Sequence, residues 1–260
     1  MTYTPKRWIR LGLGAALLGT ASLAACGGEG GEAGKTGAVA APGEAGESGE
    51  GEGGEGVSAL DPALLLPVDQ RAVLIAGEVA TGTALARAGE SAAAAGHFRL
   101  AIGDVEPGGL TRLVEAGLDP HLFDAAAGAL DDGSSYEDID AKVAAVEANV
   151  SLLRANAGGD AKSLIGYLAR RCLKAYREGV SLDNLIEDPV RYQAAYGYAV
   201  VARDLADTLD ADAASGVKLE LELLVRMWPG VGPVSGDAPA PVMNFASQIS
   251  RVELELSSIE

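Results

Sequence analysis

The sequence of 260 residues contains few of the side chains that usually carry chemistry. It has two cysteines and two histidines, and aromatic residues make up 5% of the chain. No Gly-x-Ser-x-Gly segment occurs, and no arrangement of residues suggests a Ser-His-Asp triad. These absences argue against an enzyme, and we expect no cofactor.

The two histidines, His97 and His121, are weak candidates for a metal site. Two histidines and a nearby carboxylate such as Asp119 have the right chemistry for a metal ion. However, His97 and His121 are not spaced as neighbours on one turn of a helix. We therefore expect surface or hydrogen-bonded histidines and no metal.

Positive charge is also scarce. The chain has 20 Lys and Arg residues against 37 Asp and Glu residues, which gives a formal net charge of -17. So acidic a chain is a poor ligand for nucleic acid or for anionic lipid headgroups. No nucleic-acid partner is expected.

The N-terminal apolar stretch, residues 11–22, is too short to span a bilayer as a helix. Lys6, Arg7 and Arg10 precede it and supply positive charge. A basic segment followed by a short apolar stretch is typical of a secretory signal peptide.

The end of this stretch, Leu23-Ala24-Ala25-Cys26, resembles the lipobox of bacterial lipoproteins. This resemblance implies that residues 1–25 are removed and that Cys26 is acylated, so that acyl chains such as palmitate anchor the protein in a membrane of the cell envelope. An aspartate directly after the acylated cysteine resembles an inner-membrane retention signal. This chain has Gly27 at that position instead, so the periplasmic face of the outer membrane is favoured. The alternative is an ordinary signal peptide cut at an Ala-x-Ala site.

Residues 26–57 have the composition of a tether. Residues 27–57 contain 13 glycines and seven glutamates but one lysine and no aromatic residue. So little apolar surface does not offset the entropy lost on folding, and we expect a disordered segment. A flexible Gly-rich coil of this length spans on the order of 30 Å.

The remaining residues, 58–260, suffice for one domain, and their pattern predicts an all-α fold. We expect about eight helices stacked as antiparallel pairs. Three residues, Asp61, Asp119 and Asp188, stand directly before a proline and indicate helix starts. Asp160 is a further capping residue, and a capping box begins at Ser135. Residues 218–224 alternate like a strand, but no second strand exists for pairing, so we predict a helix there.

Residues 81–107 resemble a tetratricopeptide unit, in which small residues let two helices pack closely. The residues that carry the resemblance are Gly82, Leu85, Gly89, Ala94, Phe98 and Ala101. It implies a right-handed stack with a concave face for peptides or partner proteins. No second copy follows at the 34-residue period, so a chance match within an irregular helical bundle is the alternative. Gly82 and Ala94 should lie at a close helix crossing with Phe98 buried.

The segments AGHFRLA, AYREGV and RYQAAYGYA resemble a group of uncharacterised bacterial periplasmic proteins. Those proteins carry more histidine around the first hairpin, where Glu78 and Leu100 stand in this chain. The resemblance therefore carries no histidine function over to this sequence.

Five of the seven tyrosines lie within 32 residues and have arginines around them. One interpretation is that they fill the core of an alanine-rich domain. The other is a groove for an acidic peptide or for an amphipathic ligand with a carboxylate or phosphate. The residues predicted to line that groove are Tyr167, Tyr192, Tyr196, Arg170 and Arg191. Gly197 indicates a helix face that something approaches closely.

Two functions follow. The first is a membrane-tethered module that binds a protein partner through its helical surface. The second is a carrier for an apolar or lipid-like ligand between membranes, which would need a cavity of several hundred cubic ångströms.

Overall fold

The computed structural model describes residues 66–259 except 104, 106–107, 231 and 235–237. The chain divides into two compact units, Met1–Gly54 and Glu55–Glu260, and every described residue belongs to the second. The signal peptide, Cys26, the tether and the helix start at Asp61 lie outside the described residues.

The described part of the chain folds into nine α-helices, which confirms the all-α prediction. The bounds are α1 Val68–Arg87, α2 Ser91–Gly103, α3 Gly109–Glu115, α4 Pro120–Asp131, α5 Tyr136–Ala157, α6 Ala161–Gly179, α7 Pro189–Ala206, α8 Ser215–Val225 and α9 Val242–Ser258. The alternating segment lies in α8 and is helical as predicted. None of these helices combines the length and apolar character needed to cross a membrane.

The predicted capping residues within the described ranges all cap helices. The side chains of Asp119, Ser135, Asp160 and Asp188 accept hydrogen bonds from backbone N–H groups in the first turns of α4, α5, α6 and α7. Each bond satisfies a donor that has no partner within its helix. Pro120 and Pro189 are the first residues of α4 and α7, where a missing N–H costs nothing.

The helix pair α1 and α2 packs as predicted from its small residues. A Cβ atom on Gly82 would lie 3.2 Å from two ring atoms of Phe98 and 3.3 Å from the carbonyl oxygen of Ala94. Ala94 and Phe98 are fully buried, and Gly89 turns the chain between the helices with a φ of +84°. The close crossing is therefore confirmed, whereas membership of the tetratricopeptide family stays a prediction.

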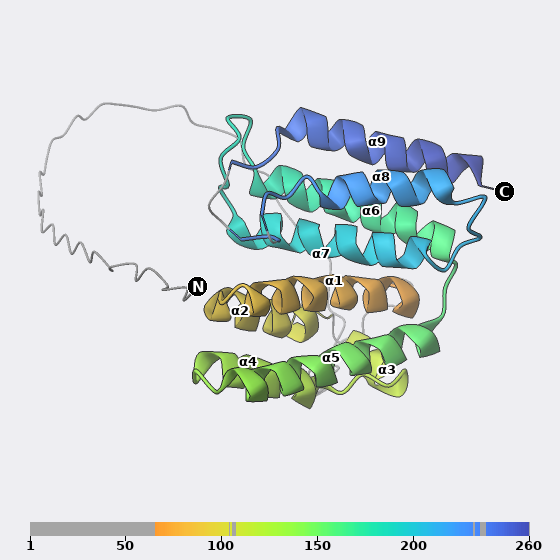
Figure 1. Ribbon diagram of the computed structural model, residues 1–260. Helices are drawn as coiled ribbons and strands as arrows, with labels where there is room; N and C mark the ends of the chain where they lie inside the picture. The colour runs from red at the N-terminus through yellow and green to blue at the C-terminus, as the bar shows by residue number, and fades with distance from the viewer. Residues whose placement is uncertain (1–65, 104, 106–107, 231, 235–237, 260) are drawn as a thin grey trace, which may run out of the picture. The chain divides into compact units, whose positions relative to one another are not determined.

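Helix α1 lies in the middle of the helical unit. In Figure 1 it lies between α7 and the group formed by α3, α4 and α5, and it contacts α2, α5, α6 and α7. Twelve of its 20 residues are buried. A helix that is covered on several sides needs apolar or small residues around most of its circumference, as the sequence of α1 provides.

An aromatic cluster fills the core between α6, α7 and α9. Tyr176 stacks on Phe245 with ring centroids 3.6 Å apart, and Trp228 meets both rings edge-on. Tyr192 packs against Tyr176 and Trp228. Cys172 is also fully buried, and its thiol donates to the carbonyl oxygen of Ala195 at 3.2 Å, so it serves as a small core residue.

Candidate functional site

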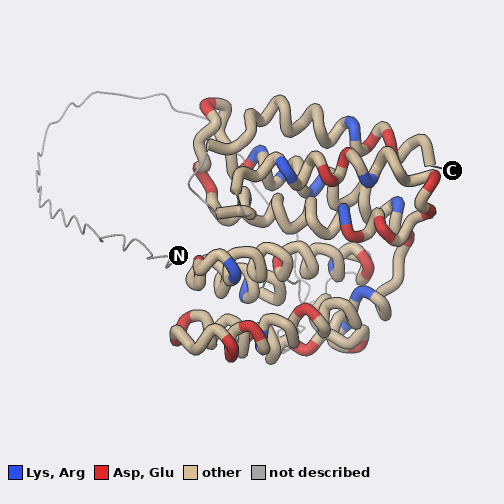
Figure 2. Tube along the Cα trace, viewed as in Figure 1, with Lys and Arg blue, Asp and Glu red and all other residues tan. Residues whose placement is uncertain are grey.

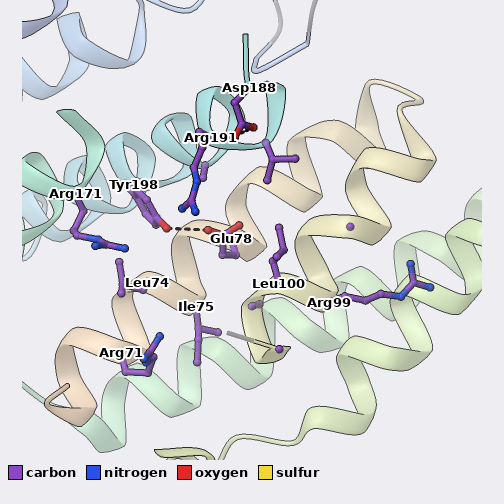
Figure 3. Close-up of a pocket in the computed structure, with 15 residues that line it drawn as sticks. Arg71, Leu74, Ile75, Glu78, Arg99, Leu100, Arg171, Asp188, Arg191 and Tyr198 are labelled. Carbon is purple, nitrogen blue, oxygen red and sulfur yellow. Dashed lines mark hydrogen bonds between the residues drawn. The ribbon is translucent and has the colours of Figure 1, made fainter. Parts of the chain in front are cut away.

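A pocket of about 750 Å³ lies where α1, α2, α6 and the start of α7 meet. Figure 3 shows its labelled lining residues. Four arginines and two acids supply its charged groups: Arg71, Arg99, Arg171, Arg191, Glu78 and Asp188. The volume is that of a site for a small molecule.

Three of the arginines point into the same space. In Figure 3 the guanidinium groups of Arg71, Arg171 and Arg191 are directed toward the region beside Leu74 and Glu78. Arg99 points away, because its guanidinium group pairs with Asp131 on α4. The pocket therefore presents guanidinium donors from three helices to one volume, a geometry suited to carboxylate or phosphate groups.

This concentration of arginine contrasts with the rest of the chain. Of the 20 Lys and Arg residues, four precede residue 66, and four of the other sixteen line this pocket. Figure 2 shows acidic residues distributed throughout the described helices. Because the chain as a whole carries a charge of -17, a local excess of positive charge is a specific feature of this pocket.

Aliphatic side chains line the wall between the arginines. Leu74 and Ile75 on α1 are buried, and Leu100 on α2 and Val190 on α7 are exposed at the rim. Such a wall suits an apolar part of a ligand whose anionic group meets the arginines.

A largely buried hydrogen-bond network lies at the wall of the pocket. The Glu78 carboxylate accepts from His97 Nδ1 at 2.7 Å and from the Tyr198 hydroxyl at 2.8 Å. His97 Nε2 faces Gln193 Oε1 at 3.2 Å, and the Thr81 hydroxyl donates to the backbone carbonyls of Gly77 and Gln193. The network joins α1, α2 and α7.

The Tyr198 hydroxyl keeps its proton over a wide pH range. Burial raises its pKa well above the ordinary value for a phenol, and the negative charge of Glu78 and the hydrogen bond to it raise the pKa further. Arg171 acts in the opposite direction, which places its positive charge near the hydroxyl. A neutral Tyr198 is thus a stable donor to Glu78 at physiological pH.

The histidines occupy different environments. His97 is 1% exposed and belongs to the network, whereas His121 is exposed on α4. Within the residues that the structure describes, no group of three or more His, Cys, Asp or Glu side chains is placed to hold a metal ion.

No protein-family model, curated protein or solved structure matches this chain.

The structure brings only one of the five predicted groove residues, Arg191, to the pocket. Tyr192 is 1% exposed in the aromatic cluster, which matches the core-filling interpretation. Tyr167 and Tyr196 are partly buried against the same core, and Tyr196 meets Trp228 edge-on. Arg170 is exposed in a separate groove along α6 and α9.

The sequence reasoning missed most of the pocket, namely Arg71, Glu78, Arg99, Arg171 and Tyr198 as site residues. One signal was available: Glu78 is the only acidic residue between Asp69 and Glu90, within the apolar run that forms α1. A carboxylate in such a run needs a partner, which His97 and Tyr198 provide.

Proposed function

We propose that this chain is a lipid-anchored protein of the bacterial cell envelope whose helical domain binds a small anionic molecule with an apolar part. The convergence of Arg71, Arg171 and Arg191 on one pocket with an aliphatic wall carries this proposal. It favours the carrier function over the protein-interaction module. The pocket has a binding role and performs no reaction.

One unsatisfied donor supports an anionic ligand in particular. Within the described residues, the buried Nε of Arg171 has no hydrogen-bond partner. A buried donor without a partner is costly, so native proteins usually satisfy it with protein, water or ligand. A carboxylate or phosphate oxygen in the pocket is a suitable acceptor.

The lipobox at Cys26 and the Gly/Glu-rich segment complete the proposal. Acyl chains on Cys26 would hold the protein at a membrane, for which the outer membrane is favoured. Residues 27–57 would let the domain move away from the membrane by a distance on the order of 30 Å. Such an arrangement suits a protein that accepts or delivers an amphipathic molecule near a bilayer.

The proposal is tested by calorimetry on the acylated protein in phospholipid nanodiscs, with empty nanodiscs as the blank. The probes are hexyl phosphate, hexanoate and hexylammonium, which share one apolar chain. We expect the two anions to bind and the cation not to bind. Equal affinity for all three, or none for any, would refute an anion pocket.

Adjacent arginines on α6 supply a matched control. Arg171→Met removes a guanidinium group from the pocket, and Arg170→Met removes one from the exposed groove. Loss of a charged hydrogen bond should weaken anion binding by about tenfold or more for Arg171→Met. Arg170→Met should bind as the unmodified protein does.

A protein-interaction module is the second candidate, and the loop between α6 and α7 supports it. Leu182 and Leu185 are 87% and 63% exposed. The loop itself is ordered by an antiparallel bridge between Val180 and Ile186 and by the Ser181 hydroxyl oxygen, which accepts a hydrogen bond from the Leu185 N–H group. Exposed leucines on a fixed loop are suited to a protein partner. The double variant Leu182→Ser/Leu185→Ser should weaken such a partner while leaving hexyl phosphate binding unchanged.

A further inference from the structure

Glu78 places a negative charge in the wall of the arginine pocket. It lines the pocket from α1, and its side chain is 13% exposed. Figure 3 draws it in the middle of the labelled residues, with its carboxylate beside the Tyr198 hydroxyl. The charge of Glu78 repels an anionic group, so its presence in a site for anions calls for a physical reason.

The carboxylate of Glu78 is fixed by two hydrogen bonds but is not saturated by them. Oε1 accepts from the Tyr198 hydroxyl at 2.8 Å, and Oε2 lies 2.7 Å from His97 Nδ1. Because an ionised carboxylate only accepts hydrogen bonds, Nδ1 is the donor in the second contact. A carboxylate offers about four acceptor sites, so Glu78 can also accept a hydrogen bond from a group inside the pocket.

A positive group lies close to this carboxylate. The Tyr198 hydroxyl interacts with both the Glu78 carboxylate and the Arg171 guanidinium group. The pocket wall therefore presents a negative and a positive side chain on either side of one hydroxyl. A ligand with an ammonium group next to an anionic group complements this pair, since each charged group of the ligand meets a side chain of opposite sign.

We propose that the ligand of this pocket carries an ammonium group next to its anionic group, and that Glu78 selects for it by accepting a hydrogen bond from the ammonium. The inference rests on the proposed function, which assigns the anionic group to the arginines and the apolar part to Leu74 and Ile75. It explains why an acidic side chain stands among three arginines. Apolar α-amino acids and phosphoethanolamine headgroups both have this chemistry.

The first test uses three probes with one six-carbon chain and one carboxylate: hexanoate, 2-aminohexanoate and 6-aminohexanoate. The two amino acids are isomers, but only the 2-isomer has its ammonium next to the carboxylate. We expect 2-aminohexanoate to bind about tenfold more tightly than hexanoate, through one further charged hydrogen bond. The 6-isomer should bind more weakly than hexanoate, because its ammonium would lie against the aliphatic wall. Calorimetry on the acylated protein in phosphatidylcholine nanodiscs measures all three affinities.

A second pair of probes distinguishes a free amino acid from a lipid headgroup. Hexyl phosphate and its phosphoethanolamine ester share the chain and the phosphate, and only the ester has an ammonium group. A gain in affinity from the ammonium in the carboxylate pair indicates an amino acid, and a gain in the phosphate pair indicates a headgroup. A gain in neither pair would overturn the proposal.

Glu78→Gln removes the charge of the selecting residue while keeping its size. The ratio of the affinities for 2-aminohexanoate and hexanoate should fall to about one, whereas hexanoate itself should bind as well as before or better. A folding defect would instead weaken both probes. Glu90→Gln is the matched control, since it removes the same charge from the exposed turn between α1 and α2 and should keep the wild-type ratio. A wild-type ratio in Glu78→Gln would overturn the role of Glu78.

Failure of this inference differs from failure of the proposed function. If neither hexanoate nor hexyl phosphate binds the unmodified protein, the proposed function fails. If both bind, but the ammonium improves neither, the anion pocket stands and selection by Glu78 is refuted. Should Glu78→Gln fail to fold, the comparison of the two isomers needs no variant, and tighter binding of the 6-isomer would refute selection of an adjacent ammonium.

Discussion

Gly197 on α7 meets Gly77 on α1 so closely that a Cβ atom on Gly197 would lie 1.9 Å from the Gly77 carbonyl oxygen. The residues that follow these glycines, Tyr198 and Glu78, are joined by a hydrogen bond of 2.8 Å. The crossing of the two glycines therefore sets the position of the network beside the pocket. The sequence indicated that something approaches α7 closely at Gly197. The structure shows that it is the backbone of α1.

Gly197→Ala should lower the free energy of unfolding by about 1–3 kcal/mol or more, because the added methyl group has no space against a backbone atom. Gly128, within α4, is the control, since a Cβ atom there would meet no atom within 4 Å. Gly128→Ala should raise stability by up to about 1 kcal/mol through helix propensity. Urea unfolding measures both changes, and equal effects at the two positions would contradict the close crossing.

Tyr192→Ala should cost roughly 3–5 kcal/mol, because it leaves a cavity in the aromatic cluster. Tyr196 is only partly buried, so Tyr196→Ala should cost clearly less. Thermal melts of the two variants check this order. Neither change should alter hexyl phosphate affinity more than about twofold, since neither tyrosine lines the arginine pocket. A large affinity change for Tyr196→Ala alone would revive the tyrosine groove.

Stability should fall at alkaline pH. Burial raises the pKa values of Tyr176 and Tyr198 above that of an ordinary phenol, about 10. Above that value the unfolded chain loses protons that the folded protein retains, so the stabilisation present below pH 10 is lost as the pH rises through the folded-state pKa values. Urea unfolding at pH 8 and pH 11 measures this loss, and Tyr198→Phe should reduce it. Unchanged stability between these pH values would show that the buried phenols do not contribute.

Cys26→Ser should leave the precursor unprocessed or release the mature protein from the membrane, because serine provides no thiol for acylation. Membrane fractionation with mass spectrometry of the N-terminal peptide measures both outcomes. Recovery of correctly cleaved, membrane-bound protein from this variant would refute the lipoprotein anchor. Cys172→Ser is the control, since this buried thiol lies in the core and should not affect membrane attachment.

The starts of α4, α5, α6 and α7 could be predicted because their signals are local. Asp119 and Asp188 each stand directly before a proline, and their side chains bond backbone groups two or three residues away. Helix α3 was missed because it has only seven residues and follows Gly108 in a left-handed conformation, without a capping side chain. Nothing in such a short segment distinguishes a helix from a loop.

The pocket could not be predicted because its residues are distant along the chain. Arg71 and Arg191 are 120 positions apart, and no sequence period relates them. The cluster of tyrosines was prominent in the sequence, but the register of α6 and α7 turns Tyr176 and Tyr192 into the core. Helix periodicity places residues on one face without telling which neighbour will cover it.

The central position of α1 also shapes how the domain must fold. Helix α1 is the first described helix along the chain, and α7, which lies more than 100 residues later, packs against much of its surface. Its apolar surface thus stays exposed until most of the chain is available, and its native contacts close long loops. We expect folding slower than that of helical bundles built from sequential neighbours, and chains truncated before residue 189 to aggregate.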